Sequence, residues 1–406
     1  MGDESVPLAS LSAEPRAEAT ALPVLVVLGR CDLRVWGLTA AARLERGFAR
    51  AGVTRRVADG APLPQGAPVI AARADYVLDE KLMTALAATP GVVLTAEGRE
   101  PGSRVAVAAH APPAQAAAAL DLLRRGVLPA GMAAPAGLRL LGPAELGSSY
   151  NEQLRKRAVP FLFSLRDTPV AEIERQTFGA SYKGATDFVT KWLWPLPARH
   201  VTRWAAELGI GPSTVTTASL VLVFVATWLF AQGHFVAGAA VAWLMTFLDT
   251  VDGKLARVTL TSTKWGNIYD HGIDLIHPPF WWGAWWVGLH TLPPGTLAPG
   301  IDAALWIILA GYVVGRLMEG LFIKLFGIET HIWRPADYAF RTVTARRNPN
   351  LAILTLAAIA GAPDWGFVLV AAWTILSLLF HAVRIVQAAL LVRRGGEVRS
   401  YLTEPA

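Results

Sequence analysis

Four aspartates stand close together in otherwise hydrophobic sequence: Asp249, Asp252, Asp270 and Asp274. A charged side chain at bilayer depth costs roughly 2.5–3.5 kcal/mol, so each acid needs a compensating partner. On helices, the first two acids (i, i+3) share one face and the last two (i, i+4) share another, so two neighbouring helices would pool four carboxylates. Oxygen-only ligation of this kind favours Mg²⁺ or Mn²⁺ over zinc.

Small residues and one arginine accompany the acids. Gly253 and Gly266 have no side chain, so a ligand or a neighbouring backbone can approach closely beside the acids. Arg257 adds a planar, permanent charge that suits a pair of phosphate oxygens. Acids for metal and an arginine for phosphate indicate chemistry on a diphosphate. The acids could instead form buried ion pairs that stabilise a helical bundle, or carry protons or sodium in a transporter.

The spacing Asp-x2-Asp-Gly-x2-Ala-Arg-x8-Gly-x3-Asp-x3-Asp resembles the signature of the CDP-alcohol phosphotransferase family. Its eight fixed positions are Asp249, Asp252, Gly253, Ala256, Arg257, Gly266, Asp270 and Asp274. The resemblance implies an enzyme of phospholipid biosynthesis. Such an enzyme transfers a phosphatidyl-type group from a CDP-linked lipid, here CDP-diacylglycerol, to an alcohol and releases CMP.

The resemblance also implies roles for single residues. The four aspartates would hold metal, and Asp274 would in addition take the proton from the acceptor hydroxyl as general base. Gly253, Ala256, Arg257 and Gly266 would line the nucleotide. A homodimer is expected from the resemblance as well.

Composition divides the chain into two parts. At 406 residues, 53% hydrophobic and 17% charged, the chain is too apolar for an ordinary soluble enzyme and long enough for two domains. Uninterrupted hydrophobic stretches begin only after about Gly211. The single cysteine, Cys31, excludes a disulfide framework and a cysteine-based metal site. Lys and Arg cluster beside hydrophobic spans, which indicates a membrane protein and anionic head groups rather than a nucleic-acid partner.

Strands and helices alternate in the front half. We expect strands at about 24–29, 53–58, 67–72, 92–95 and 104–109 and helices at 38–52, 80–88 and 115–125. This alternation predicts a soluble, cytoplasmic α/β domain with a mostly parallel sheet over residues 21–145. The polar, acidic residues 1–20 are expected to be a disordered tail.

The front domain more weakly resembles the nucleotidyltransferase-like domain that precedes some CDP-alcohol phosphotransferases. The resemblance is carried by the turn at Gly29, the helix start at 37–39, and Asp75, where that fold holds its metal. The turn at 29–37 reads GRCDLRVWG and lacks the Gly-x-Gly spacing that wraps a nucleoside triphosphate. A degenerate domain that serves assembly, regulation or orientation is therefore favoured over a working cytidylyltransferase.

Residues 146–210 are expected to be a connector that ends in an interfacial amphipathic helix. Aromatic residues there alternate with Lys191, Arg199, His200 and Arg203, as suits the boundary between membrane and water. The stretch 210–216 resembles the entry of many family members into their first membrane helix, and its Thr216 is a candidate nucleotide contact.

Six apolar spans follow, at about 214–232, 235–256, 265–289, 302–325, 350–362 and 365–392. They predict an all-α, six-helix transmembrane domain over residues 211–394 and a cytoplasmic tail at 395–406. Three turns, near Gly233, at 290–301 and near Pro363, contain no Lys or Arg, whereas the opposite loops are basic. The positive-inside rule therefore places both termini and the acidic motif on the cytoplasmic side of the inner (plasma) membrane.

A basic loop between the fourth and fifth spans is expected on the same side as the acids. Its arginines are Arg334, Arg341, Arg346 and Arg347. We interpret them as a pocket for an anionic acceptor such as inositol phosphate or glycerol phosphate, and a solvated loop is the alternative. Arg316 and Glu319 are expected to pair with each other, and His277 and His381 to be core residues.

Overall fold

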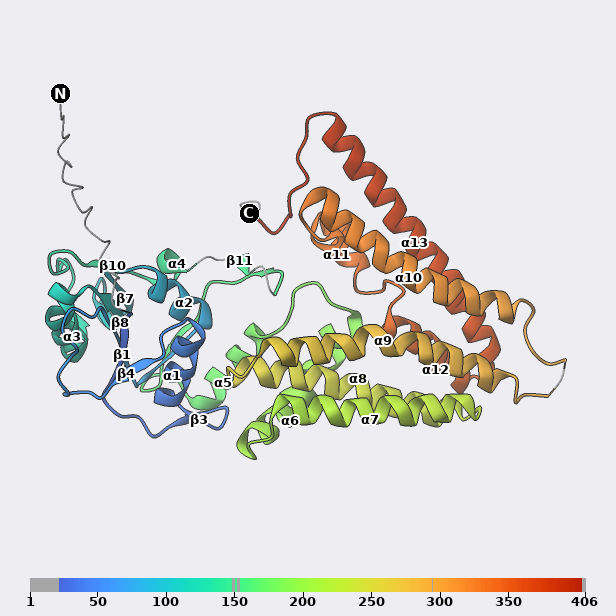
Figure 1. Ribbon diagram of the computed structural model, residues 1–406, viewed down its shortest axis with the longest axis horizontal. Coiled ribbons are helices and arrows are strands. Elements are labelled where there is room, and N and C mark those ends of the chain that lie inside the picture. Colours follow the sequence, from blue (N-terminus) through green and yellow to red (C-terminus); the bar gives the residue numbers. More distant parts are fainter. Residues whose placement is uncertain (1–21, 148–149, 152–153, 294, 404–406) are drawn as a thin grey trace, which may run out of the picture.

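A computed structural model describes residues 22–147, 150–151, 154–293 and 295–403 of the chain. A strand-containing N-terminal part sits beside a C-terminal part built from long helices (Figure 1). The tail expected at 1–20 lies outside the described residues. The two parts correspond to the expected division into an α/β region and a helical region.

The N-terminal part contains a seven-stranded sheet of order β10-β7-β8-β5-β1-β4, with β9 paired to β8. Its strands are β1 (Val24–Leu28), β4 (Arg55–Val57), β5 (Val69–Arg73), β7 (Val92–Glu97), β8 (Arg104–Ala111), β9 (Val127–Leu128) and β10 (Arg139–Leu141). Strand β1 pairs in parallel with β4 and β5, and β7 in parallel with β10. Strand β8 runs antiparallel to β5, β7 and β9.

The expectation of a mostly parallel sheet is therefore wrong, because the sheet is mixed. Strands β7 and β8 are joined by a short turn over residues 98–103 rather than by a helix. A short connection can only return the chain antiparallel, whereas parallel neighbours need a long crossover. The sequence shows alternating strands but not this local pairing.

Helices cover both faces of the sheet. α1 (Ala40–Arg50) and α2 (Glu80–Ala88) share one hydrophobic cluster with the sheet, and α3 (Ala116–Arg125) belongs to a second cluster on the other side. Thr39 and Asp79 cap α1 and α2, because their side-chain oxygens accept from the amides of Ala42 and Lys81. These helices agree with the ranges expected from the sequence.

Short elements link the two parts. A small hairpin, β2 (Arg34–Val35) and β3 (Leu38–Thr39), precedes α1. Further along the chain, β6 (Tyr76–Leu78) pairs with β13 (Leu162–Ser164), and β11 (Tyr150–Asn151) with β12 (Lys156–Arg157). α4 (Pro143–Leu146) lies at the end of the expected α/β region, and α5 (Val170–Ala180), the π-helical η2 (Val189–Leu193) and α6 (Pro195–Glu207) lie in the region expected to be the connector.

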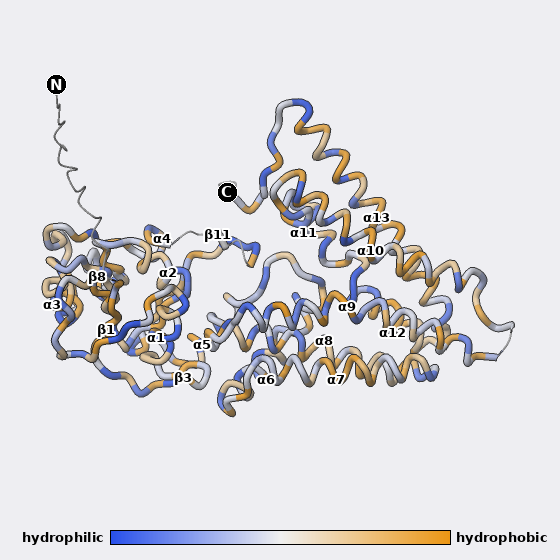
Figure 2. The backbone as a smooth tube through the Cα atoms, viewed as in Figure 1, coloured by the Kyte–Doolittle hydropathy of each residue, from blue (hydrophilic) through white to orange (hydrophobic). Residues whose placement is uncertain are grey.

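Long helices form the C-terminal part. Four of the described helices are long and apolar enough to cross a membrane: α7 (Pro212–Ala231), α8 (Phe235–Val258), α10 (Ile301–Phe326) and α13 (Pro363–Arg393). α9 (Lys264–Leu289) is also long but carries acids in its first half, and α12 (Arg347–Ile359) has only 13 residues. Hydrophobic residues predominate along these helices (Figure 2), and the chain is a membrane-integral protein.

Packing in the helical part centres on α7. Both α8 and α9 pack extensively on α7 but contact each other little, and α10 packs on α13. Buried rings at the α7–α9 contact, among them Phe230, Trp281 and Trp285, form the core of this region. Gly288 allows the close approach, since a Cβ there would lie 1.9 Å from the carbonyl oxygen of Phe230. The short η3 (Thr330–Ile332) and α11 (Pro335–Phe340) lie between α10 and α12.

Candidate active site

Helices α8 and α9 bring the acids of the sequence motif together. One carboxylate oxygen from each of Asp249, Asp270 and Asp274 lies within 4.8 Å of the others. Asp252 is only 2% exposed, and its Oδ2 accepts a hydrogen bond from Thr216 Oγ1 at 2.6 Å. Its Oδ1 is buried without a partner among the described residues. Three of the four carboxylates expected to pool thus lie together, whereas Asp252 belongs neither to this group nor to the lining of the cavity beside it.

A guanidinium bridges two of these acids. Arg347, at the start of α12, donates from Nη2 to Asp249 Oδ2 at 2.7 Å and from Nη1 to Asp274 Oδ1. The alternative of buried ion pairs thus accounts for Asp249 and Asp274. It does not account for Asp252 and Asp270, which pair with no lysine or arginine in the described part of the chain.

The residues present suit a divalent cation. Their donors are carboxylate oxygens, the ligands that Mg²⁺ and Mn²⁺ prefer. The unpartnered Oδ1 of Asp252 is an unusual feature, because buried polar atoms normally have a partner. A guanidinium already held between two of the acids shows that the cluster attracts positive charge.

A cavity of about 500 Å³ opens beside the carboxylates. Its charged lining residues are Arg155, Lys183, Asp187, Asp249, Lys254, Arg257, Asp270, Asp274, Arg316, Glu319, Glu329, Arg341, Arg346 and Arg347. Acids and bases from distant segments thus face one space. Such a lining suits a ligand that carries several phosphate groups together with a cation.

The residues expected to line the nucleotide fall into two groups. Gly253, Ala256 and Arg257 line the cavity, whereas Gly266 and Thr216 do not. The amide of Gly266 donates to Thr263 Oγ1 at 2.9 Å and so belongs to the cap of α9. Thr216 instead holds Asp252 by its hydroxyl.

Arg257 has the strongest signature of a ligand contact in this group. It lines the cavity, and its Nε is buried without a partner among the residues the structure describes. A Cβ on Gly253 would lie 3.1 Å from its Nη2, so the glycine leaves room for the guanidinium. An unpaired buried guanidinium nitrogen is costly unless a ligand satisfies it.

Three of the four arginines expected to hold the acceptor phosphate also line the cavity. These are Arg341, Arg346 and Arg347, whereas the guanidinium of Arg334 lies 4.4 Å from the ring centre of Trp333, outside the lining. Nε and Nη1 of Arg341 are buried and lack partners within the described residues. Arg346 donates to Glu319 and leaves its Nε unpaired in the same way.

The connector contributes residues to the cavity that the sequence did not single out. Arg155, Lys183 and Asp187 lie in the stretch expected to be only a linker, yet all three line the cavity. Burial, and then the positive charges of Arg257 and Arg155, lower the pKa of the Lys183 ammonium. The basic character of residues 155–157 and 183 is the one local signal, and it equally suits a segment that lies near the membrane.

A second cluster of possible metal ligands adjoins the same cavity, which Glu319 and His331 line. It contains Glu319, His331 and His381. The guanidinium of Arg346 already contacts Glu319 and approaches Nε2 of His331 at 3.2 Å, so a cation there would have to displace it. Arg316 pairs with Glu319 at 3.4 Å, which confirms the expected ion pair. His277 and His381 are both buried, as expected of core residues. They are not fully satisfied, because Nε2 of His277 and both ring nitrogens of His381 have no partner among the described residues.

The N-terminal part shows no comparable arrangement at the residues expected to matter. Asp75 pairs with Arg73 at 2.8 Å and with Arg166 at 2.7 Å. The segment that would wrap a nucleotide forms the β2–β3 hairpin instead, and its tip residue Trp36 is fully buried. The resemblance to a nucleotidyltransferase stays a prediction, and these contacts lend it no support.

Comparison with known proteins identifies the helical part. Residues 210–376 match the family model of the CDP-alcohol phosphatidyltransferases, so this part of the chain is a CDP-alcohol phosphatidyltransferase domain. The expected family resemblance is thereby confirmed. The matched residues include all four aspartates and the three cavity-lining arginines of the basic loop.

Individual relatives of known name are similar to shorter stretches of the chain. The phosphatidylinositol phosphate synthase of Mycobacterium tuberculosis is 33% identical over 96 residues, which are 22% of this chain and 43% of the relative. The archaetidylinositol phosphate synthase of Pyrococcus horikoshii is 34% identical over 79 residues, 19% of this chain and 42% of the relative. The chain thus spans less than half the length of the curated relatives it matches.

This chain is also similar to a solved structure of the Mycobacterium tuberculosis phosphatidylinositol phosphate synthase with CDP-DAG bound. The aligned residues make up 46% of this chain and 91% of the chain in that structure. The sequence identity is 19% and the TM-score 0.36.

Proposed function

We propose that this chain is an integral membrane CDP-alcohol phosphotransferase of phospholipid biosynthesis. It would transfer a phosphatidyl-type group from CDP-diacylglycerol or a similar CDP-linked lipid to a polyol phosphate and release CMP. The single observation that carries this proposal is the cavity that Asp249, Asp270 and Asp274 line together with Arg257 and Arg341, within a CDP-alcohol phosphatidyltransferase domain. Both arginines keep buried nitrogens that have no partner among the described residues.

One or two Mg²⁺ or Mn²⁺ ions, held by Asp249, Asp252 and Asp270 with Asp274 beside them, would neutralise the charge of the donor diphosphate. Arg257 would bind the phosphate of the nucleotide side, with Gly253 and Ala256 leaving room for it. Gly266 and Thr216 would act indirectly, through the α9 cap and through Asp252.

Asp274 is the proposed general base. Its side chain is 40% exposed, which makes it more open to the cavity than Asp249 at 15% or Asp270 at 26%. It would accept the proton of the acceptor hydroxyl while that oxygen attacks the phosphorus bearing the lipid. The bond from that phosphorus to the CMP oxygen breaks, and CMP leaves. Arg347 would orient the carboxylate for this step.

The acceptor is proposed to be a polyol phosphate, with inositol phosphate as the first choice. Arg341 and Arg346 offer unpaired buried nitrogens to its phosphate, and Arg155 and Lys183 add positive charge from the connector. Arg334, which stacks on Trp333, is not part of the proposed phosphate pocket. Two relatives, named phosphatidylinositol phosphate synthase and archaetidylinositol phosphate synthase, support the same choice.

The membrane arrangement completes the proposal. In addition to the four candidate spans, α9 and α12 would line the bundle and give six membrane helices. The basic loops would place the active site and both termini on the cytoplasmic side of the inner membrane, where a lipid donor and a soluble acceptor can meet. A homodimer is proposed on the family relation alone.

CMP release tests the proposal. Purified full-length protein with Mg²⁺ and CDP-diacylglycerol should release CMP with inositol phosphate or glycerol phosphate and much more slowly with inositol or glycerol. Activity only with an uncharged alcohol would refute the acceptor. No CMP with any donor, together with ion-coupled uptake into vesicles that Asp252→Asn abolishes, would favour a transporter. Pyrophosphate release from CTP by the full chain would favour a cytidylyltransferase.

A further inference from the structure

Three arginines of the N-terminal domain lie along one face of α1 and reach into the helical part. Arg43, Arg46 and Arg50 are spaced i, i+3 and i+7, so they share a face of the helix. Arg43 donates from Nη1 to the carbonyl oxygen of Val258 at 2.6 Å. Arg46 donates to that of Thr259 at 3.2 Å, and Arg50 to that of Ser262.

These carbonyls belong to the end of α8 and to the turn that joins α8 to α9, residues 259–263. The last carbonyls of a helix have no partner within it, and positive charge near that end is favourable. Arg43 is 5% exposed, so its contact is made away from water. The arginines therefore cap α8 from a different domain.

Leu260 adds a hydrophobic anchor at the centre of the turn. Its φ is +56°, a conformation that a leucine rarely adopts. Its side chain is buried in the cluster that contains Leu44 and Phe48 of α1. Strain of this kind persists only when the surrounding structure imposes it. The N-terminal domain thus contacts this turn in two ways, by hydrogen bonds to its carbonyl oxygens and by packing around the Leu260 side chain.

The held turn lies midway between the two halves of the carboxylate motif. Asp252 precedes Thr259 by seven residues and Asp270 follows Thr263 by seven, about 10 Å along each helix. α8 and α9 contact each other little but both pack on α7, so the turn acts together with α7 to constrain how one helix is rotated relative to the other. That rotation decides whether both carboxylate pairs face one point.

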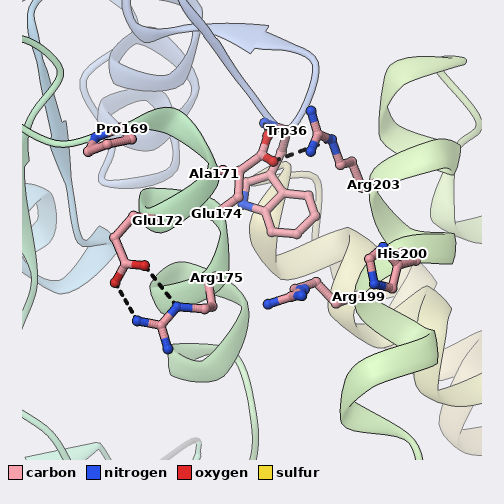
Figure 3. Close-up of a pocket in the computed structure, with 9 residues that line it drawn as sticks. All are labelled: Trp36, Pro169, Ala171, Glu172, Glu174, Arg175, Arg199, His200 and Arg203. Carbon is pink, nitrogen blue, oxygen red and sulfur yellow. Dashed lines mark hydrogen bonds and ion pairs between the residues drawn. The ribbon is translucent and has the colours of Figure 1, made fainter.

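A second contact keeps α1 in place. At the tip of the β2–β3 hairpin, the Trp36 amide donates to Glu174 Oε1 and its indole Nε1 to Thr177 Oγ1, both at 2.9 Å. Figure 3 shows Trp36 beside Glu174 of α5 and Arg203 of α6. Gly37 approaches α6 so closely that a Cβ would lie 2.6 Å from the carbonyl oxygen of Ala206.

We propose that the N-terminal domain is a positioning element of the metal site, in which Arg43, Arg46 and Arg50 set the geometry of the carboxylates through the α8–α9 turn. The proposal rests on the proposed metal-dependent transfer. It gives the domain a role in catalysis without a chemical step of its own. The residues at 29–37, which would wrap a nucleotide in a nucleotidyltransferase, serve as the docking hairpin.

Binding of Mn²⁺ tests this role without relying on turnover. Free Mn²⁺ is measured by electron paramagnetic resonance as it is titrated into full-length protein in detergent. The variant Arg46→Ala/Arg50→Ala should raise the Kd for Mn²⁺ about tenfold, at the lower end of what lost supporting contacts cost a metal site. Lysine at both positions can still donate to the carbonyls and should restore the Kd to within about threefold of wild type.

Arg56→Ala is the matched control, because Arg56 contacts α1 through Glu45 but does not reach the turn. It should leave the Kd unchanged. At saturating Mn²⁺ the double variant should regain most of its kcat, which a misfolded protein would not. If the double variant folds poorly, the exposed Arg46→Ala alone should raise the Kd about threefold.

An unchanged Kd in the alanine variants, or an equal rise in Arg56→Ala, would overturn the positioning role. The proposed function fails separately. If wild type binds Mn²⁺ in a manner that depends on Arg46 and Arg50 but releases no CMP with any donor, the positioning role stands and the transferase does not.

Discussion

Arginines are used differently in the two parts of this molecule. In the N-terminal domain, Arg46 and Arg50 each donate to a backbone carbonyl of the helical part, and neither is among the described residues with a buried, unpartnered nitrogen. Arg43 also donates to such a carbonyl, although its buried Nε has no partner among the described residues. Around the cavity, Arg257 and Arg341 keep buried nitrogens that have no partner in the described part of the chain. A satisfied guanidinium stabilises the fold, whereas a buried unsatisfied one costs free energy until a ligand arrives. The contrast separates docking cations from binding cations within one basic chain.

The largest expected effect follows removal of a carboxylate in the helical part. Asp270→Asn should lower kcat for CMP release about 10³-fold, because a ligand of the charge-neutralising ion is lost. Asp302→Asn is the control, since that acid is 77% exposed at the start of α10 and outside the cavity. Comparable losses in the two variants would mean that the cavity acids have no special role.

Disruption of the docking hairpin should be the next largest effect, and it should act on stability. Trp36→Ala removes a fully buried ring and the indole hydrogen bond to Thr177 of α5, while the backbone amide can still donate to Glu174. We expect the free energy of unfolding to fall by about 3 kcal/mol. Thermal denaturation of the protein in detergent measures this loss. Leu33→Ala, in the same segment but 46% exposed, should change the free energy of unfolding by less than about 0.5 kcal/mol. If the Trp36 variant were as stable as wild type, the β2–β3 hairpin would not contribute to holding the N-terminal part against α5 and α6.

The acceptor pocket predicts a difference between two arginines of the same loop. Arg341→Ala should raise KM for inositol phosphate about 30-fold, because a hydrogen bond to a charged phosphate is lost. Arg334→Ala should leave this KM nearly unchanged, since Arg334 stacks on Trp333 outside the cavity. The KM for CDP-diacylglycerol should stay the same in both. Equal effects of the two substitutions would place the acceptor elsewhere.

A smaller effect is expected from the pH dependence of acceptor binding. Because burial and neighbouring arginines lower the pKa of Lys183, its ammonium loses its charge at a lower pH than an exposed lysine. The KM for a phosphorylated acceptor should therefore rise by about threefold or more as the pH increases, and the rise should begin below the pH of about 10.4 at which an exposed lysine titrates. Lys183→Arg keeps the charge and should flatten that rise. An identical pH profile in both proteins would exclude Lys183 from the pocket.

Local pattern was enough to predict much of this molecule. The spacing of the four aspartates placed Asp249, Asp270 and Asp274 around one point, because side chains three and four residues apart share a helix face. Helices α1, α2 and α3 lie where the alternation of strand-like and helical runs predicted them. Turn chemistry and periodicity are properties of neighbouring residues, so they are visible in sequence.

Long-range contacts were not visible in the same way. Arg347 and Asp249 are 98 residues apart, and no local signal says that the arginine expected to hold acceptor phosphate also bridges two acids. The antiparallel β8 and the cavity contacts of Arg155 and Lys183 depend equally on distant partners. Arg334 and Arg341 look alike in sequence, and only their surroundings separate them.

The central claim is that the motif carboxylates hold divalent ions on a CDP-linked donor. An experimental structure of the full-length protein with Mn²⁺ and CDP-diacylglycerol tests it most directly, by anomalous scattering at the manganese edge. We expect one or two anomalous peaks within ligand distance of Asp249, Asp252 and Asp270, with the diphosphate beside Arg257. Donor bound elsewhere, or carboxylates still bridged by Arg347 with no anomalous peak among them at saturating Mn²⁺, would contradict it.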